Sequence, residues 1–189
     1  MSEKGILLQI VNKELFHGCL SENLGLYSGK MGLSVFLYHY SRFTDNMLFA
    51  DFAGELIDEV CESIYDGISL SFSSGLSGIG WGLEYLAKNR FIEIDDNSVF
   101  ADINYKILEI NPDNVRDCSF AKGLEGISTY VHAHISAGRM GKILFPPAFI
   151  QSLDGRCLPK TDSMVWDEIL QEKNVDGLSW QNGLRILIK

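Results

Sequence analysis

One glycine-rich motif recurs along the chain at an interval of about fifty residues, a spacing typical of repeat proteins. Its clearest copy is the segment GLSGIGWGLEYL at 75–86, and the other copies begin at Gly25, Gly123 and Gly177. An apolar run follows each copy, and a helix that is apolar on most sides is buried. The recurrence therefore predicts an array of similar helical units, each begun by a glycine-rich turn.

The glycines of the motif suggest two structural requirements. The opening glycine of each copy is expected to adopt a positive φ, which glycine reaches without steric cost. Inner glycines such as Gly78 and Gly80 each cost a helix about 1 kcal/mol relative to alanine. Because this cost recurs, we expect a packing reason there, such as the close approach of a neighbouring backbone. The alternative is four unrelated helix starts.

Amphipathic segments separate the glycine-led runs. Apolar residues recur at steps of four from Leu48 to Ile64, and a similar stripe runs from Val99 to Ile110. Both patterns predict helices with one wet side, and their acidic residues are expected to form solvated surface. A further amphipathic helix is expected to begin at Asp162.

Two other segments carry specific expectations. Residues 4–15 have helical spacing, and the run from Phe16 to Cys19 is expected to lead into a loop. Residues 137–160 contain several glycines and the pair Pro146-Pro147, so we expect a long connection there, with a short extended piece at 143–145.

This alternation predicts an all-α fold of α/α-hairpin repeats over residues 1–189, taken as a single domain. Amphipathic helices would surround about four inner helices, each led by a glycine-rich turn, in a partial α/α toroid. The apolar C-terminal segment 184–188 would then need covering. Self-association, giving a homo-oligomer, or a surface on a partner protein would cover it.

Composition limits the partners and the compartment. The chain has 189 residues and a net charge of −9, which argues against nucleic acid or an anionic membrane as the main partner. No apolar run reaches transmembrane length, and the N-terminal residues lack the layout of a signal peptide. The four cysteines form no Cys-x-x-Cys pair, so we predict a reduced, cytoplasmic protein.

The glycine motifs resemble those of the lanthionine synthetase C-like (LanC-like) family. The copies at 25–40, 75–86 and 123–135 fit well, and the copy at 177–188 fits more loosely. The resemblance implies a toroid of α/α hairpins in which glycine motifs begin the inner helices. It also implies a role in the biosynthesis of modified, lanthipeptide-type peptides.

The family's cyclases bind zinc through two cysteines and a histidine, including an adjacent Cys-His pair. The zinc activates a peptide thiol, which adds to a dehydrated serine or threonine. This sequence contains no adjacent Cys-His pair, so no ligand is transferred and no metal or other cofactor is predicted. We therefore expect a zinc-less accessory member that binds a peptide or partner protein. The alternatives are an active zinc-dependent thioether cyclase with non-standard ligands, and an α/α-toroid enzyme acting on carbohydrate.

No catalytic residue is assigned from the sequence, but some residues are candidates for lining an inner cavity. Aromatic side chains with a carboxylate suit a peptide or sugar groove, although each candidate also fits simple core packing. His132 and His134 stand two positions apart, so a regular helix directs them to different sides and they cannot share one metal. The candidates are Trp81, Glu84, Tyr85, His132, His134 and Cys118.

Overall fold

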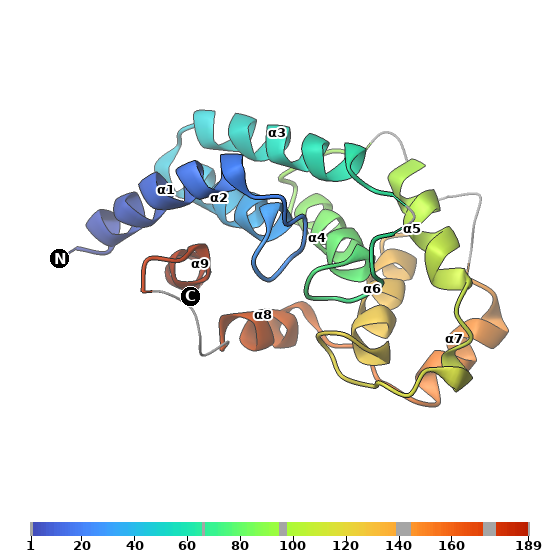
Figure 1. Cartoon of the computed structure of the whole chain (residues 1–189). Helices are drawn as coiled ribbons and strands as arrows, with labels where there is room; N and C mark the ends of the chain where they lie inside the picture. Colours follow the sequence, from blue (N-terminus) through green and yellow to red (C-terminus); the bar gives the residue numbers. More distant parts are fainter. Residues whose placement is uncertain (1, 66, 95–97, 139–144, 172–176, 189) are drawn as a thin grey trace. The chain divides into compact units, whose positions relative to one another are not determined.

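The computed structural model describes residues 2–65, 67–94, 98–138, 145–171 and 177–188, and these contain helices and no strand. The all-α prediction is thus confirmed for the described part of the chain (Figure 1). The helices are α1 Glu3–Leu20, α2 Lys30–Thr44, α3 Leu48–Glu62, α4 Leu76–Lys88, α5 Ser98–Leu108, η1 Pro112–Asn114, α6 Leu124–Ser136, α7 Pro147–Asp154, α8 Asp162–Leu170 and α9 Trp180–Leu187.

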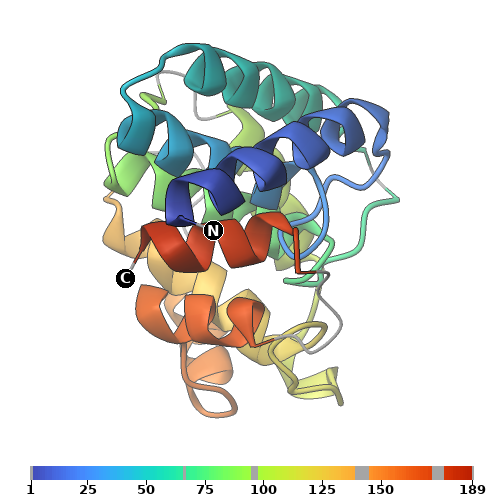
Figure 2. The ribbon, with the colours of Figure 1, turned by 90° about the vertical axis from the view of Figure 1, so that its left-hand side faces the viewer.

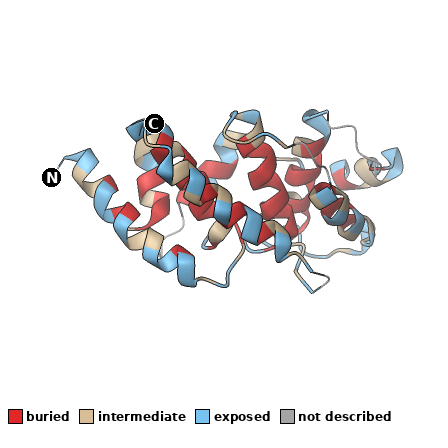
Figure 3. Cartoon of the chain, turned by 90° about the horizontal axis from the view of Figure 1, so that it is seen from above, coloured by how far each residue is buried: buried red, intermediate tan, exposed pale blue. Residues whose placement is uncertain are grey.

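The predicted alternation of buried and half-exposed helices is present. Every residue of α4 from Leu76 to Leu86 is buried, and α2 and α6 are buried along most of their length (Figure 3). In α3 and α5, by contrast, only a stripe of side chains is buried. The glycine-led helices are therefore those that contribute most to the core.

The chain divides into two compact units. The first comprises residues 1–63 with 163–189 and contains α1, α2, α3 and α9. Helix α3 packs on α2, and α9 packs on both α1 and α2, so the last helix lies beside the first (Figure 2). Small residues make this possible, since the Trp180 ring lies against Gly32 and the Phe36 ring against Gly183.

The second unit comprises residues 64–162, and helices α4 and α6 form its centre. The Tyr130 ring of α6 lies so close to Gly80 of α4 that any Cβ at this position would overlap it. Helix α5 packs on α4, while α7 packs on η1 and α6. A packing reason for an inner glycine is therefore present at Gly80, where the close neighbour is the Tyr130 side chain and not a backbone.

Three of the buried helices begin with the same seven-residue loop, which we call the helix-entry loop. It occupies residues 23–29, 69–75 and 117–123, directly before α2, α4 and α6. In each copy, the N–H of the first helical residue donates to the carbonyl of the first loop residue. The pairs are Lys30 to Asn23 (2.8 Å), Leu76 to Ser69 (2.9 Å) and Leu124 to Asp117 (3.0 Å).

The last residue of each helix-entry loop is a glycine, namely Gly29, Gly75 or Gly123. Their φ angles are −120°, −127° and −111°, so the expectation of a positive φ is wrong. A Cβ on any of them would overlap the carbonyl oxygen of the first residue of its own loop. That oxygen belongs to the backbone and is held by the hydrogen bond described above, so glycine is required by close approach rather than by backbone angle.

The helix-entry loops correct the alignment of the first and fourth copies of the motif. The glycine equivalent to Gly75 and Gly123 is Gly29, four residues after Gly25. In the fourth copy, the residue that caps α9 is Ser179, whose hydroxyl accepts a hydrogen bond from the Asn182 N–H. The Gly-Leu dipeptide therefore does not mark the start of α2 or of α9. The start of α2 is set by the hydrogen bond from Lys30 to the Asn23 carbonyl, and α9 is capped by Ser179.

Two predicted connections contain helix instead. Helix α1 continues through residues 16–19 to Leu20, and Gly18 allows close contact with Leu33 rather than ending the helix. Helix α7 lies within the predicted long connection, with Pro147 in its first turn. Proline is favoured there because the first helical N–H groups have no partner within the helix. Of the expected extended piece, residues 143 and 144 lie outside the described part.

Candidate functional site

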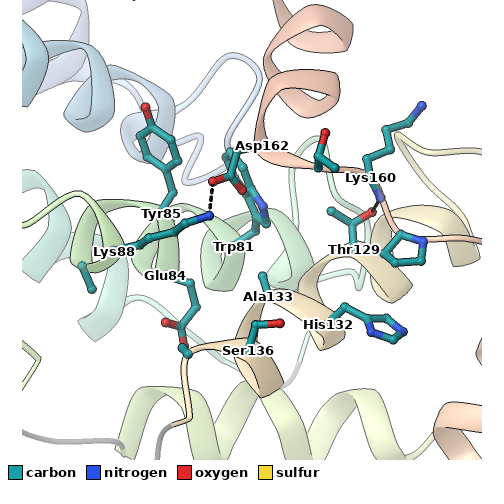
Figure 4. Close-up of a pocket in the computed structure, with 14 residues that line it drawn as sticks. Trp81, Glu84, Tyr85, Lys88, Thr129, His132, Ala133, Ser136, Lys160 and Asp162 are labelled. Carbon is teal, nitrogen blue, oxygen red and sulfur yellow. Dashed lines mark hydrogen bonds and ion pairs between the residues drawn. The ribbon is translucent and has the colours of Figure 1, made fainter.

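The second unit contains a cleft of about 580 Å³ between α4, α6 and the segment before α8. Figure 4 shows Trp81, Glu84, Tyr85 and Lys88 along the α4 side and Thr129, His132, Ala133 and Ser136 along α6. Residues 159–162 form the third wall. Positions three and four apart share a helix face, so the turns of each helix place these side chains together.

Two aromatic rings form the base of the α4 wall. Trp81 and Tyr85 are stacked, with ring centroids 5.3 Å apart and an interplanar angle of 23°. Both side chains are buried, and Trp81 also contacts the Phe72 ring. The predicted aromatic residues therefore line the cleft, but little of either side chain is exposed.

An ion pair connects two walls of the cleft at its exposed side. The Lys88 Nζ lies 2.6 Å from the Asp162 Oδ2, and the Lys88 side chain is 70% exposed. An exposed pair of this kind contributes little to stability, about 0–1 kcal/mol, because solvent screens it. Lys88 and Asp162 can therefore separate and each bind a charged group of a ligand at a small cost in free energy.

The third wall is tied to α6 by its backbone. The Lys160 N–H donates to the Thr129 hydroxyl at 3.0 Å. The Lys160 ammonium lies 3.5 Å from a Glu125 carboxylate oxygen and 5.0 Å from the Phe120 ring centroid. The charge of Lys160 is thus shared with Glu125 and Phe120, while its backbone holds the wall in place.

Glu84 begins a buried chain of hydrogen bonds that leads away from the cleft. His134 Nδ1 lies 2.7 Å from the Glu84 Oε1, and His134 Nε2 lies 2.9 Å from the Asn104 Nδ2. The Tyr130 hydroxyl donates to the Asn104 Oδ1 at 2.8 Å. Because an amide nitrogen only donates, His134 Nε2 must accept, which places the proton on Nδ1. The ring then donates that proton to the Glu84 carboxylate.

The two histidines of α6 lie in different environments, as their spacing predicts. His134 is buried in the chain described above, whereas His132 lines the cleft and is partly exposed. His132 Nε2 lies 2.7 Å from the Asp154 Oδ1 at the end of α7. The carboxylate partner of His132 is thus Asp154, which lies on α7, a helix that was not predicted from the sequence.

Cys118 does not line the cleft. It lies in the third helix-entry loop, exposed, with its sulfur 3.6 Å from the Arg156 Nη2. Of the candidates named from sequence, the cleft brings together Trp81, Glu84, Tyr85 and His132. His134 lies behind Glu84, and Cys118 lies elsewhere in the unit.

Several residues of the site were not among the sequence candidates. Lys88 follows Glu84 by one helical turn, so helical spacing could have identified it as a residue on the same face. Asp162 was recognised only as a helix cap, and Lys160 only as part of a connection. Asn104 lies on the buried stripe of α5. Because buried polar groups are normally hydrogen-bonded, a polar residue at such a position indicates a nearby partner.

Metal ligands and membrane spans were sought in the same part of the chain. Among the described residues, no group of three or more His, Cys, Asp or Glu side chains is placed to hold a metal ion. The described helices include none with the length and apolar character needed to cross a bilayer.

Comparison of the chain with protein-family models, with curated proteins and with solved structures gives no match.

Proposed function

We propose that the chain is a LanC-like protein with α/α-hairpin repeats arranged as a partial toroid, and that it binds a peptide in the cleft of its second unit. Its role would be that of a zinc-less accessory or binding member in the maturation of modified peptides. The repeated helix-entry loops and the alternation of buried and half-exposed helices support the architecture. The composition of the cleft supports the ligand class.

The observation that carries the peptide proposal is the mixture of groups around one cleft. Trp81 and Tyr85 line it, together with the side chains of Thr129 and Ser136 and the exposed Lys88–Asp162 ion pair. Ligand sites are commonly apolar clefts of roughly 300–1,000 Å³ with a few placed polar groups. A peptide supplies apolar side chains, backbone donors and acceptors, and charges of both signs, so it matches all these features.

Binding is favoured over catalysis because the carboxylates of the cleft already have partners. Glu84 is hydrogen-bonded to His134, and Asp162 is paired with Lys88. A general base must reach a substrate proton within hydrogen-bond distance, and here one oxygen of each carboxylate, Glu84 Oε1 and Asp162 Oδ2, is already engaged within the protein. The geometry thus supports a binding role, in which Lys88 and Asp162 give up their mutual ion pair and contact charged groups of the peptide.

The test is a selection from a random library of unmodified peptides on the immobilised full-length protein. Enriched peptides are then measured against wild type, Lys88→Glu and the matched control Lys106→Glu. Lys106 also pairs with a carboxylate, Glu109, but lies on α5 outside the cleft. We expect Lys88→Glu to change affinity at least about tenfold, as for loss of one charged contact. Equal affinities for all three proteins, or no enrichment, would contradict the proposal.

One observation favours a second candidate, an enzyme acting on carbohydrate. Glu84 and Asp162 line the same cleft, and glycosidases generally use two carboxylates on either side of the scissile bond. Release of nitrophenol from a panel of nitrophenyl glycosides, abolished in Glu84→Gln and in Asp162→Asn, would establish this function. The limited exposure of the Trp81 and Tyr85 rings weighs against it, since sugars stack on open ring faces.

A further inference from the structure

Helix α1 is apolar on two opposite sides. Its inner side packs on α2 and α9 (Figure 2), and Ile10 lies there against Gly183 of α9. Three large apolar side chains of α1 nevertheless remain exposed, since Leu8 is 51% exposed and Phe16 and Leu20 are each 68% exposed. A surface helix normally presents polar side chains to solvent, and a helix that is apolar all round is buried. The exposed side of α1 therefore has the character of an interface.

The three exposed apolar residues share one face of the helix. Positions three and four apart lie on the same side of a helix, and most exposed residues from Leu8 to Leu20 follow this spacing. We call this group the outer face, and its members are Leu8, Gln9, Asn12, Phe16, Cys19 and Leu20. Single exposed apolar residues are normal on a protein surface, but three aligned along about 18 Å of one helix form a patch.

Charge indicates what covers the outer face. The chain has 25 acidic and 16 basic residues, yet every residue of the outer face is uncharged. The exposed side of α3, in the same unit, is by contrast acidic, with Asp51, Glu55, Asp58, Glu59 and Glu62. A basic partner would be drawn to α3, and an anionic membrane would be repelled by the net charge. A second copy of the chain matches the outer face, because it supplies the same uncharged, apolar surface.

Two charges at the ends of α1 select the direction in which two copies pair. Lys4 is exposed in the first turn, and Glu22 is exposed just after Leu20, the last residue of the helix. Two parallel copies of α1 would place like charges side by side at each end. In an antiparallel pair related by a two-fold axis, Lys4 of each copy lies beside Glu22 of the other, so both ends gain an attraction.

We propose that the outer face of α1 is the interface of a homodimer, in which the two α1 helices lie antiparallel about a two-fold axis near Lys13. The two Phe16 side chains then lie close to the axis, each beside Asn12 of the other copy, and Leu8 lies beside Cys19 of the other copy. Aromatic residues near the centre of an interface carry much of its binding energy. The interface belongs to the first unit and does not depend on peptide binding in the cleft.

Sedimentation velocity of the reduced full-length protein at increasing concentration tests the dimer. We expect a dissociation constant of about 10 µM, because a contact limited to one helix from each copy is at the small end of specific interfaces. Phe16→Glu should weaken dimerisation at least about tenfold, since it removes the central ring and introduces a charge there. Leu48→Glu is the matched control, because Leu48 is 72% exposed at the start of α3, and this variant should dimerise as wild type does.

Exchange of the end charges tests the antiparallel direction. Lys4→Glu and Glu22→Lys should each weaken dimerisation by about fivefold, because each places like charges side by side at both ends. The variant that carries both substitutions should recover the wild-type dissociation constant, since it only reverses the two pairs. This recovery separates an effect on the interface from an effect on folding.

A cysteine cross-link tests the register of the pair. The two Cys19 residues of the dimer lie roughly 16 Å apart along the helix axis, which is too far for a disulfide. Leu8→Cys places a thiol beside Cys19 of the other copy, so mild oxidation should join positions 8 and 19 of different chains. Peptide mapping by mass spectrometry identifies this bond, and wild type should form no bond between its two Cys19 residues.

Contrary results would overturn the proposal. A protein that stays monomeric well above the expected constant, or dimers of equal strength in wild type and Phe16→Glu, would show that the outer face does not pair two copies. A bond between two Cys19 residues, or no recovery in the doubly substituted variant, would contradict the antiparallel pair. Binding of wild type to phosphatidylcholine vesicles that is lost in Phe16→Glu would assign the outer face to a membrane instead.

Discussion

His134 donates its Nδ1 proton to the Glu84 carboxylate at 2.7 Å, and the identity of Asn104 on the other side of the ring is what sets this direction. Glu84 is thus linked to a neutral imidazole whose second nitrogen is also occupied. Of the four residues linked by these hydrogen bonds, Glu84 lines the cleft, whereas His134, Asn104 and Tyr130 are not among its described lining residues.

The tautomer of His134 is a direct prediction. Nitrogen NMR of histidine-labelled protein at neutral pH should show a neutral ring protonated at Nδ1. Asn104→Asp replaces the donor with an acceptor, so we expect the ring to become doubly protonated between two carboxylates. Tyr130→Phe removes a hydrogen bond from Asn104 without changing its donor and should leave the tautomer as it was. A wild-type ring protonated at Nε2 would contradict this arrangement.

The helix-entry loops predict which glycines the fold requires. Gly75→Ala and Gly123→Ala should each lower the free energy of unfolding by about 2–3 kcal/mol, because the added Cβ meets a backbone carbonyl that cannot rotate away. Gly177→Ala is the control, since the space beside Gly177 is open, and it should change stability by no more than about 0.5 kcal/mol. Urea unfolding measures all three. If all three substitutions lower the free energy of unfolding by similar amounts, glycine is not specifically required at the last position of the helix-entry loop.

His39 predicts a loss of stability in mild acid. Burial, together with the nearby charge of Arg42, lowers the pKa of His39 from 6.5 to about 4. The unfolded chain then binds a proton below about pH 6.5 that the folded protein does not bind until about pH 4. Stability therefore falls as the pH drops through this window, by up to about 3 kcal/mol from this residue.

Urea unfolding at several pH values should show this dependence flattened in His39→Gln. His17→Gln, at an exposed position, should keep the wild-type slope. If His39→Gln and wild type lose stability equally between pH 6.5 and 4, another group is responsible.

Zinc content separates the binding role from the cyclase alternative. Protein purified without added metal or a metal-binding tag should contain well under one zinc per chain and take up none on titration. The reason is that the described residues contain no suitable group of ligands and the sequence contains no adjacent Cys-His pair. Elemental analysis measures the content. About one zinc per chain would reverse the assignment, and its loss in Cys118→Ser would identify one ligand.

Periodicity predicted the helices well, and connections were predicted less well. Helix α4 was predicted correctly because its apolar residues and its glycine start both indicate a buried helix after Gly75. Helix α7 was missed because Pro146-Pro147 resembles a break, although proline fits the first turn of a helix. The end of α1 was missed because the run from Phe16 to Cys19 was expected to lead into a loop, whereas the helix continues there and Gly18 packs against Leu33.

The site could be predicted only as far as one helix face extends. Trp81, Glu84 and Tyr85 share a face of α4, so their common position in the cleft followed from helical spacing. Asp162 and Asp154 enter the site from segments far along the chain, and no local pattern connects them to α4 or α6.

The hydrogen bond that closes each helix-entry loop uses backbone atoms on both sides, so it does not depend on the side chains at most loop positions. Asn23, Ser69 and Asp117 differ in chemistry yet present the same carbonyl. The bond therefore constrains the first loop residue only through its carbonyl, whereas the fourth loop residue is buried and apolar in each copy, as Leu26, Phe72 and Phe120. The other loop positions can differ between copies while the carbonyl, this buried side chain and the closing glycine keep the start of the helix in place.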